Sequence, residues 1–422
     1  MKVLIVNKFL YPNGGSETYI FEIGKELEKL GHEVQFFGME HKGRIVGNKV
    51  NAYTSDMDFH TGKLAKLLYP FKILYSFEAK KQIRKVLDDM QPDVVHLNNI
   101  NFQITPSIID EICDYRKKTG RDVKIISTAH DYQWVCPNHM MRIPSADVNC
   151  DKCIGGKNGS CSKNKCIHNS TVKSILGTIE ANLYRMKKTY AKVDKIICPS
   201  EFLYKQFSRD DILKGDVANK SDNKMIDKNN ECSRLVVKHN FFIKSDDYDK
   251  VKDLPKKDYV LYFGRFSKEK GMGSLINAVK NLPEVPFVFA GTGPLEAELK
   301  GIDNIDNRGF LSGEELHTLI RQARFSIYPS EWYENCPFAV MESVSYGTPV
   351  LGADIGGIPE LIGTGDAPTG QLFASGDADA LTDTIFKLWN DEALQKSMEA
   401  NCAGNDYDTV ESYVKWLVEE IY

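Results

Sequence analysis

The sequence predicts an α/β protein made of two doubly wound parallel-sheet domains, each Rossmann-like, that face each other across a cleft. The first observation is a repeated alternation of short apolar runs with longer amphipathic segments. The second is that each run is β-branched or aromatic and bounded by glycine, proline or polar residues, as buried parallel strands are. The third is the length of 422 residues, which suits two large domains at roughly 150 residues per domain with connecting segments.

The first half of the chain contains five runs that we predict to be strands. They cover residues 3–6, 34–37, 94–97, 123–127 and 195–198. A helix follows the first run, because Ile20, Ile23, Leu27 and Leu30 recur at helical spacing. Gly31 then supplies a C-terminal stop for this helix.

A second series of strands begins after residue 258. It covers residues 259–264, 287–291, 325–328 and 349–353. Leu275, Ala278 and Val279 recur at helical spacing, which predicts a helix after the first of these strands. The pattern of the first half therefore starts again in the second half.

The break between the halves is visible in composition. Residues 208–233 are rich in Asp, Lys and Asn, which predicts a surface excursion near the domain boundary, with the hinge close to Asn240. We therefore expect an N-terminal domain over 1–240 and a C-terminal domain over 241–404. Residues 405–422 form an amphipathic helix that we expect to pack back on the N-terminal domain.

Composition excludes several classes of protein. Hydrophobic residues make up 42% and charged residues 27% of the chain, which excludes wholesale disorder. The net charge of −4 argues against a general nucleic-acid coat. No run approaches the roughly 18–20 apolar residues of a membrane span, and residues 3–6 are too short for a signal peptide. We expect a cytosolic protein with reduced cysteines.

Ligands of open parallel sheets bind beyond the carboxyl ends of the strands, so the residues at those ends are candidates for the site. Gly14 and Gly15 follow the first strand and precede a helix, where backbone can approach an anion closely. His130 follows the fourth strand. The alternatives are glycines that serve only the turn and a histidine with a structural role.

Two cations follow the first strand of the second half. Arg265 and Lys270 flank a turn between strand and helix, where they could neutralise a diphosphate, the arginine through a bidentate fork and the lysine as a point charge. The alternative is solvated surface charge.

The most informative local segment is 331–342, which follows the strand at 325–328. We expect Pro337 at the first helical position and Gly347 as the helix stop. Glu334 and Glu342 lie about two turns apart and can accept hydrogen bonds from sugar or ribose hydroxyls. The free amides near Asn335–Phe338, a segment that includes Cys336 and Pro337, are expected to form an anion site. The alternative is one acid favoured by the helix dipole and one ordinary surface glutamate.

Cys336 lies at the expected helix N-terminus, a position that lowers the pKa of a thiol. We therefore expect alkylation of Cys336 to inactivate the protein and a bound donor to protect it. The alternative is a small, inert packing residue.

Together these segments resemble family 4 glycosyltransferases over nearly the whole chain. The motifs that carry the resemblance are Glu334-x7-Glu342, Gly264-Arg265-x4-Lys270-Gly271, Gly291-Thr292-Gly293-Pro294, the Gly14-Gly15 loop and Pro199-Ser200-Glu201. The resemblance implies the two-domain GT-B fold, a nucleotide-sugar donor such as a UDP- or GDP-sugar, and retention at the anomeric carbon. It implies an acceptor-side N-terminal domain and a donor-binding C-terminal domain.

The resemblance also implies roles for single residues. Arg265 and Lys270 would hold the donor diphosphate, Glu342 the ribose hydroxyls, and Glu334 the hydroxyls of the donor sugar. Gly15 would approach the phosphate or sugar, and His130 would lie near the reacting centre. No catalytic metal and no protein nucleophile is expected.

A cysteine-rich insertion is expected over 136–168. Cys150-x2-Cys153-x7-Cys161-x4-Cys166 places four thiols within 17 residues, which in a reducing compartment predicts a structural zinc site. Cys136 or His168 could replace one ligand, and an iron–sulfur cluster or free thiols are the alternatives. Such an insertion departs from the common family pattern and would shape acceptor choice.

Residues 60–87 interleave basic and apolar side chains, which is typical of segments that lie on anionic membranes. The alternative is a core-facing helix pair with a charged outer face. Relatives often act on lipid-linked carriers, so we expect a saccharide or lipid-linked acceptor and a cytoplasmic protein peripheral to the inner membrane face.

Two other classes of function stay open. A GT-B sugar-nucleotide epimerase would need no acceptor, and a phosphorylase would need free phosphate. A nucleic-acid-binding zinc module is a remote third reading, because the insertion is basic but has no aromatic run for base stacking. We expect no nucleic-acid partner.

Overall fold

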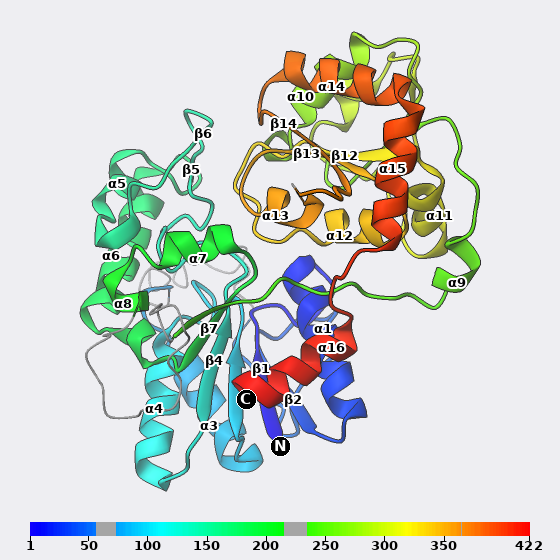
Figure 1. Ribbon diagram of the computed structural model, residues 1–422. Coiled ribbons are helices and arrows are strands. Elements are labelled where there is room, and N and C mark those ends of the chain that lie inside the picture. Colours follow the sequence, from blue (N-terminus) through cyan, green and yellow to red (C-terminus); the bar gives the residue numbers. More distant parts are fainter. Residues whose placement is uncertain (56–72, 215–233, 364) are drawn as a thin grey trace. The chain divides into compact units, whose positions relative to one another are not determined.

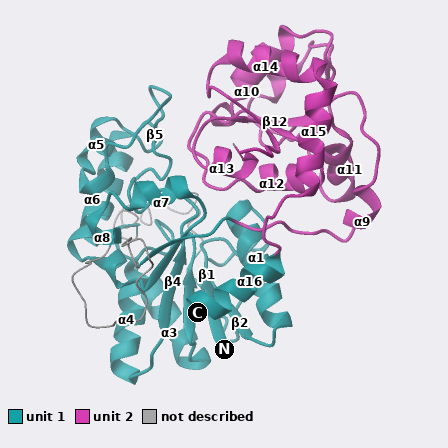
Figure 2. Ribbon diagram, viewed as in Figure 1, with its two compact units in different colours: residues 1–239, 410–422 teal, residues 240–409 magenta. Residues whose placement is uncertain are grey.

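The computed structural model describes residues 1–55, 73–214, 234–363 and 365–422 (Figure 1). By its internal contacts the chain divides into two compact units. Unit 1 consists of residues 1–239 and 410–422, and unit 2 consists of residues 240–409 (Figure 2).

Unit 1 is built on a six-stranded sheet with the order β2-β1-β3-β4-β7-β8, and every neighbouring pair is parallel. The strands are β1 (Lys2–Val6), β2 (Glu33–Phe37), β3 (Val94–Leu97), β4 (Lys124–Thr128), β7 (Lys195–Cys198) and β8 (Leu235–Val237). Val3 of β1 pairs with Val34 of β2 on one side and with Val94 of β3 on the other. Strands β1, β3 and β4 are buried, apart from the first residue of β1 and of β4. This is why they read as continuous apolar runs.

The helices of unit 1 connect these strands. They are α1 (Gly15–Lys29), α3 (Phe77–Met90), α4 (Ser107–Thr119), α7 (Glu201–Phe207) and α8 (Asp211–Lys214). The long connection from β4 to β7 contains β5 (Arg142–Ile143), β6 (Val148–Asn149), η1 (Ile154–Gly156), α5 (Gly159–Lys163), α6 (Thr171–Met186) and η2 (Thr189–Lys192). The cysteine-rich segment lies inside this connection.

The chain end also belongs to unit 1. Helix α16 (Val410–Trp416) lies against α1 and continues into the final turn η5 (Leu417–Ile421). The Tyr413 and Tyr19 hydroxyls are 3.0 Å apart, and the Tyr422 hydroxyl lies 2.6 Å from Nδ1 of His96 on β3. The last thirteen residues are therefore bonded into the core of the N-terminal sheet.

Unit 2 contains a second six-stranded parallel sheet, with the order β11-β10-β9-β12-β13-β14. The strands are β9 (Val260–Phe263), β10 (Phe287–Ala290), β11 (Ile305–Asn307), β12 (Phe325–Tyr328), β13 (Val350–Ala353) and β14 (Gly370–Phe373). The helices are α9 (Tyr248–Val251), η3 (Lys268–Lys270), α10 (Met272–Lys280), η4 (Glu296–Leu299), α11 (Glu314–Gln322), α12 (Phe338–Ser345), α13 (Ile358–Ile362), α14 (Ala378–Asn390) and α15 (Glu392–Ala403). Val260, Phe289 and Phe325 are fully buried in its core.

The two parallel sheets confirm the predicted fold class. Among the described residues, no helix combines the length and the apolar character needed to cross a bilayer.

Candidate functional site

The candidate donor site lies in unit 2, where the strand order reverses. Strands β9 and β12 are neighbours in the sheet, but the chain leaves β9 toward β10 and β11 and returns to start β12 on the other side. Crevices for ligands form at such switch points. Arg265 and Lys270 follow β9, and Glu334 follows β12, so the structure brings the two predicted segments to the same edge of the sheet.

The loops after β9 and β12 are fastened to each other. The Glu331 amide donates to the Glu269 carbonyl at 3.0 Å, and the Ser274 hydroxyl donates to Glu331 Oε1 at 2.6 Å. Gly271 has φ +74°, and a Cβ atom there would lie 1.8 Å from the carbonyl oxygen of Pro329. Only glycine permits this approach, so Gly271 determines how close the two loops lie.

The closest charged contact of the site joins Lys270 to Glu334. Lys270 Nζ donates to Glu334 Oε1 at 2.5 Å, and the same oxygen accepts from Ser330 Oγ at 3.0 Å and from Trp332 Nε1 at 2.6 Å. The Glu334 side chain is buried, with 9% exposed, whereas 24% of the Lys270 side chain is exposed. The carboxylate is therefore held in one orientation, and the Lys270 side chain remains partly exposed.

The electrostatics keep Lys270 charged. Burial acts to lower the pKa of Lys270, but attraction to Glu334 and contact with Tyr328 outweigh it and raise the pKa above its usual range. The ammonium also lies over the rings of Trp332 and Tyr328, at 5.3 and 5.6 Å from their centroids. A fixed positive charge at this point suits an anionic ligand.

Arg265 lies in the same loop and is exposed. Its carbonyl accepts a hydrogen bond from the Tyr262 hydroxyl at 2.8 Å, which anchors the backbone. Within the described parts of the chain, its guanidinium has no hydrogen-bond or ion-pair partner. The fork is thus available to a ligand.

Helix α12 begins one residue later than predicted. Pro337 caps it, with φ −71° and ψ 121°, and Phe338 is the first helical residue. Asn335 and Phe338 are partly buried, and Cys336 and Pro337 are buried.

The expected lowering of the pKa of the Cys336 thiol was wrong. Burial raises the pKa of its thiol to about 12. The Asn240 amide donates to Sγ at 3.3 Å, and Nδ2 of Asn240 donates to the Cys336 carbonyl at 2.9 Å. Desolvation has outweighed the effect of the helix N-terminus, so Cys336 is a packing residue.

Glu342 has a different partner from Glu334. Its Oε1 lies 3.4 Å from Nε2 of His317, whose Nδ1 lies 2.8 Å from Oδ1 of Asp247. Tyr346 stacks on the same imidazole, with ring centroids 4.8 Å apart. Burial acts to lower the pKa of His317, but the two carboxylates raise it above its usual value. Sequence reasoning missed His317, because its pairing depends on the packing of α11 against α12.

The corresponding switch point of unit 1 lies between β1 and β3. Gly14 and Gly15 are exposed at the start of α1, where Gly14 is the capping residue. Asn99 Nδ2 donates to the Ser16 hydroxyl at 2.9 Å, and Asn7 Nδ2 donates to Glu17 Oε1 at 2.7 Å. These asparagines, which sequence reasoning missed, fix the helix start relative to the strands.

His130 follows β4 and is half-buried. Its Nε2 lies 2.8 Å from Asn98 Oδ1, and Nδ2 of Asn98 is directed at two backbone carbonyls, so Nε2 carries the proton in this network. The Tyr19 ring packs edge-on against the imidazole, at 4.9 Å between centroids. Burial lowers the pKa of His130 to about 3, so the ring is neutral, with Nδ1 as its acceptor.

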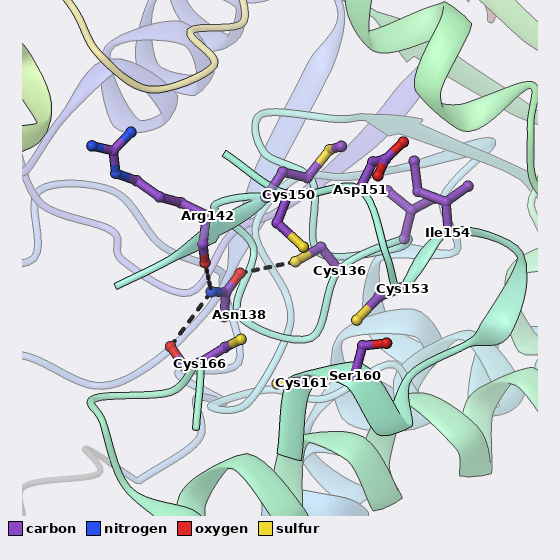
Figure 3. Close-up of a pocket in the computed structure, with 12 residues that line it drawn as sticks. Cys136, Asn138, Arg142, Cys150, Asp151, Cys153, Ile154, Ser160, Cys161 and Cys166 are labelled. Atoms are coloured by element: carbon purple, nitrogen blue, oxygen red, sulfur yellow. Dashed lines mark hydrogen bonds between the residues drawn. The ribbon is translucent and has the colours of Figure 1, made fainter. Parts of the chain in front are cut away.

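The cysteine cluster gives the predicted zinc site no support. Figure 3 shows its side chains gathered around one small pocket, with the Cys136 thiol donating to Asn138 Oδ1 at 2.8 Å. Cys153, Cys161 and Cys166 pack with Ile143 as a small apolar core. Burial raises the pKa values of Cys136 and Cys153 to about 12. No group of three or more His, Cys, Asp or Glu residues in the described chain could hold a metal ion, and Cys150 is a free thiol like the others.

Of the predicted membrane segment 60–87, residues 60–72 lie outside the described residues. In its described part, α3 buries one apolar face, and Lys80 and Arg84 pair with Glu111 of α4 at 3.2 and 2.6 Å. These two cations are therefore engaged within unit 1.

Family models match both halves of the chain. The model described as Glycosyltransferase Family 4 matches residues 13–217, and that described as Glycosyl transferases group 1 matches residues 244–403.

Curated relatives support the same assignment. The chain is 32% identical over 147 residues to a sulfoquinovosyl transferase of Arabidopsis thaliana, a match that covers 34% of the chain and 28% of the relative. It is 24% identical to an uncharacterized protein of the cps region of Klebsiella pneumoniae, over 86% of the chain and 87% of the relative. The matches span less than half of the length of the first relatives found.

Solved structures share the fold. Sucrose-phosphate synthase of Thermosynechococcus elongatus matches with a TM-score of 0.65 at 15% identity, covering 99% of this chain and 97% of that one. HepE of Anabaena, solved in complex with UDP, matches with a TM-score of 0.63 at 16% identity over the whole of both chains. With both halves matched and the GT-B architecture present, the chain belongs to the family 4 glycosyltransferases, which confirms the resemblance found in its sequence.

Proposed function

We propose that the protein is a retaining glycosyltransferase that moves a sugar from a nucleotide-diphosphate donor to a saccharide or lipid-linked acceptor. The observation that carries the proposal is the Lys270–Glu334 pair at the β9/β12 switch point, with the exposed guanidinium of Arg265 in the same loop. Two cations beside a fixed carboxylate match a ligand that is a diphosphate at one end and a polyol at the other.

In the donor-binding unit, Arg265 and Lys270 bind the diphosphate and stabilise the charge that develops as it leaves. Glu334 accepts hydrogen bonds from the donor sugar. Glu342 binds the ribose hydroxyls through the carboxylate that His317 orients. Backbone amides from Asn335 to Phe338 contribute to the same ligand.

In unit 1, Gly14 and Gly15 leave space for close approach of a phosphate or sugar to the backbone, as the family resemblance implies. The family resemblance implies that His130 would lie near the reacting centre. Because its pKa is low, it acts as a neutral hydrogen-bonding group and adds no charge.

The reaction proceeds at the front face of the anomeric carbon. The bond from that carbon to the phosphate oxygen breaks, the bond to the acceptor oxygen forms on the same face, and the departing phosphate takes the acceptor proton. The protein contributes positioning and electrostatic stabilisation, without a metal or a protein nucleophile.

We place the protein in synthesis of a surface polysaccharide or glycolipid, as a cytoplasmic enzyme peripheral to the membrane. Named relatives support the substrate class: an O-antigen chain mannosyltransferase of Escherichia coli and a lipopolysaccharide outer core galactosyltransferase are among the similar proteins. HepE has been solved with UDP-glucose, which supports a nucleotide-sugar donor of this kind.

The test is a thermal-shift screen with UDP, GDP, ADP and their sugars, followed by NMR of the product formed with the donor that binds. The expected product keeps the anomeric configuration of the donor. Inversion would remove the retaining assignment. Conversion of the donor without an acceptor would indicate an epimerase, and phosphate-dependent cleavage of a glycoside would indicate a phosphorylase.

A further inference from the structure

His317 of α11 lies between two carboxylates that come from different segments of unit 2. Its Nδ1 lies 2.8 and 2.9 Å from the two oxygens of Asp247, and its Nε2 lies 3.4 Å from Oε1 of Glu342. The side chains of His317 and Asp247 are 11% and 12% exposed, whereas that of Glu342 is 30% exposed. The imidazole therefore links a buried carboxylate to one that can reach a ligand.

The contacts of this ring favour an imidazole that carries two protons. Nδ1 faces both oxygens of a carboxylate, so it carries the proton that it donates to Asp247. A neutral ring would then turn the lone pair of Nε2 toward Glu342, and two acceptors that face each other repel. An imidazolium instead presents an N–H to each carboxylate, and both carboxylates raise the pKa of His317 against the effect of burial.

Asp247, which caps α9, shows the same pairing from its own side. Burial acts to raise the pKa of Asp247, but hydrogen bonds from Ser245 and His317 outweigh burial and lower it. The Ser245 hydroxyl also lies 2.6 Å from the Tyr346 hydroxyl. Asp247 and His317 are thus a charged pair, and a hydroxyl bonded on both sides holds its carboxylate in place.

Tyr346 holds the imidazole in the orientation that this pairing needs. It follows Glu342 by four residues, so both side chains lie on one side of α12. The Tyr346 ring stacks on the imidazole with centroids 4.8 Å apart and planes 17° from parallel. Tyr346 therefore covers the flat face of the imidazole, while Glu342 meets its Nε2 edge.

Other charged groups near the imidazole are engaged with different partners. Helix α9 packs against α11, and its Lys250 pairs with Glu314 at 3.5 Å. Tyr248 of α9 packs on Tyr346, with ring centroids 5.3 Å apart. In the described part of the chain, the ionisable side chains that face the imidazole are those of Asp247, Glu342 and Tyr346.

We propose that the Asp247–His317 pair positions the Glu342 carboxylate for a ribose, and that it does so only while the imidazole is charged. Glu342 directs Oε1 to the imidazolium, and its remaining lone pairs accept the ribose hydroxyls. When the ring loses its proton, the lone pair of Nε2 repels the carboxylate, which then turns away from the ligand. The pair thereby makes the site select a ribose over a 2′-deoxyribose.

His317 is a positioning residue, because it acts on the ligand through Glu342. The inference rests on the proposed function, since it takes Glu342 as the ribose contact. The other reading is that Asp247 and His317 only fasten α9 to α11. That reading predicts a loss of stability on substitution and no change in which sugar is selected.

The test is titration calorimetry with UDP, GDP or ADP, whichever the wild type binds, and with the 2′-deoxy form of the same nucleotide. The ratio of the two dissociation constants isolates the ribose contact, because base and phosphates are the same. At pH 6.5 the wild type is expected to bind the ribonucleotide roughly tenfold or more tightly. This ratio is expected to fall as the pH rises to 9, because the contact needs protonated His317, whose pKa is raised.

Three variants separate the contacts of the ring. His317→Asn retains an N–H for Asp247 but none for Glu342, and it is expected to lower the ratio at pH 6.5 roughly fivefold or more. His317→Gln places an amide N–H toward Glu342, and it is expected to restore most of the ratio and to remove its dependence on pH. Asp247→Asn keeps the imidazole and its stack, and it is expected to move the fall in the ratio about one unit toward lower pH.

The matched control is Glu314→Gln, which breaks the other ion pair between α9 and α11 and leaves the imidazole untouched. It is expected to keep the ratio of the wild type at both pH values. An unchanged ratio in His317→Asn, or a wild-type ratio that does not vary with pH, would overturn the inference and leave the proposed function standing. The wild-type profile and Asp247→Asn decide the matter if His317→Asn does not fold. A wild type that binds none of the three nucleotides would remove the proposed function, and the inference with it.

Discussion

Lys270 Nζ lies 2.5 Å from Glu334 Oε1, and these two residues come from loops that follow adjacent strands on the two sides of the switch point. Gly271 and the Glu331 amide hold the loops together. The carboxylate is buried and thus orients the ammonium of Lys270, whose side chain stays partly exposed. A bound diphosphate would share this lysine with the carboxylate, so donor affinity and local stability are linked.

Lys270→Met is expected to lower turnover by two to three orders of magnitude, because a cation aimed at the leaving phosphate is lost. It is also expected to destabilise the protein by about 2 kcal/mol, since it leaves the buried Glu334 carboxylate without its counter-charge. Adding Glu334→Gln to Lys270→Met should restore most of the stability and none of the turnover. Urea unfolding and initial rates, with the exposed Lys280→Ala as control, separate the two effects. Normal turnover in Lys270→Met would contradict this role for the lysine.

Cys336 is expected to react slowly with iodoacetamide in the native protein. Its pKa of about 12 leaves roughly one thiolate in ten thousand at pH 8, and the side chain is buried. Peptide mass spectrometry after timed labelling, with the urea-unfolded chain as reference, measures the rate. Labelling as fast in the native as in the unfolded protein would show that Cys336 is accessible and reactive after all.

Stability is expected to fall as the pH decreases below about 6.5. Burial lowers the pKa of His96 to about 3, so between these two pH values the unfolded chain binds a proton that the folded chain does not. The free energy of unfolding therefore decreases by up to about 1.4 kcal/mol per pH unit for this one group. Comparing urea unfolding at pH 7.5 and 5.5 for the wild type and His96→Gln should show a smaller difference in the variant. The exposed His168→Gln is the control and should behave as the wild type. If the free energy of unfolding changed equally between the two pH values in the wild type and in His96→Gln, His96 would not be the cause.

Tyr422→Phe is expected to destabilise the protein by about 1–2 kcal/mol. The substitution removes the hydroxyl that lies 2.6 Å from Nδ1 of the fully buried His96, and the imidazole nitrogen is left without that partner. Lys415→Ala, an exposed position on the same C-terminal helix, should change stability by less than about 0.5 kcal/mol. Equal stability of the wild type and Tyr422→Phe would show that the chain end is held by packing alone.

The central strands could be predicted from sequence, but several edge strands could not. Strands such as β1, β9 and β12 are buried on both faces and therefore form unbroken apolar runs. The edge strand β11 consists of Ile305, Asp306 and Asn307, and two polar residues in a run of three are typical of a loop. Such short edges are defined by pairing with a neighbour, which a local pattern does not contain.

The candidate site shows the same limit. Lys270 and Glu334 could be found because each follows the end of a strand. The partners of the two glutamates, Ser330, Trp332 and His317, could not, since they depend on how loops and helices pack. The expected lowering of the Cys336 pKa failed because a local rule about helix ends ignored burial. Helix α6 has the apolar periodicity of a core helix, and only the structure shows that its aliphatic face is turned outward.

The central claim is that the loops after β9 and β12 bind the diphosphate of a nucleotide sugar. Titration calorimetry of the wild type and Arg265→Ala with the best nucleoside diphosphate, and with the same nucleoside lacking phosphate, tests it most directly. The account predicts at least a hundredfold weaker binding of the nucleoside by the wild type, and an Arg265→Ala variant that loses affinity for the diphosphate only. Equal affinity of the wild type for both ligands, or unchanged diphosphate binding in Arg265→Ala, would contradict it.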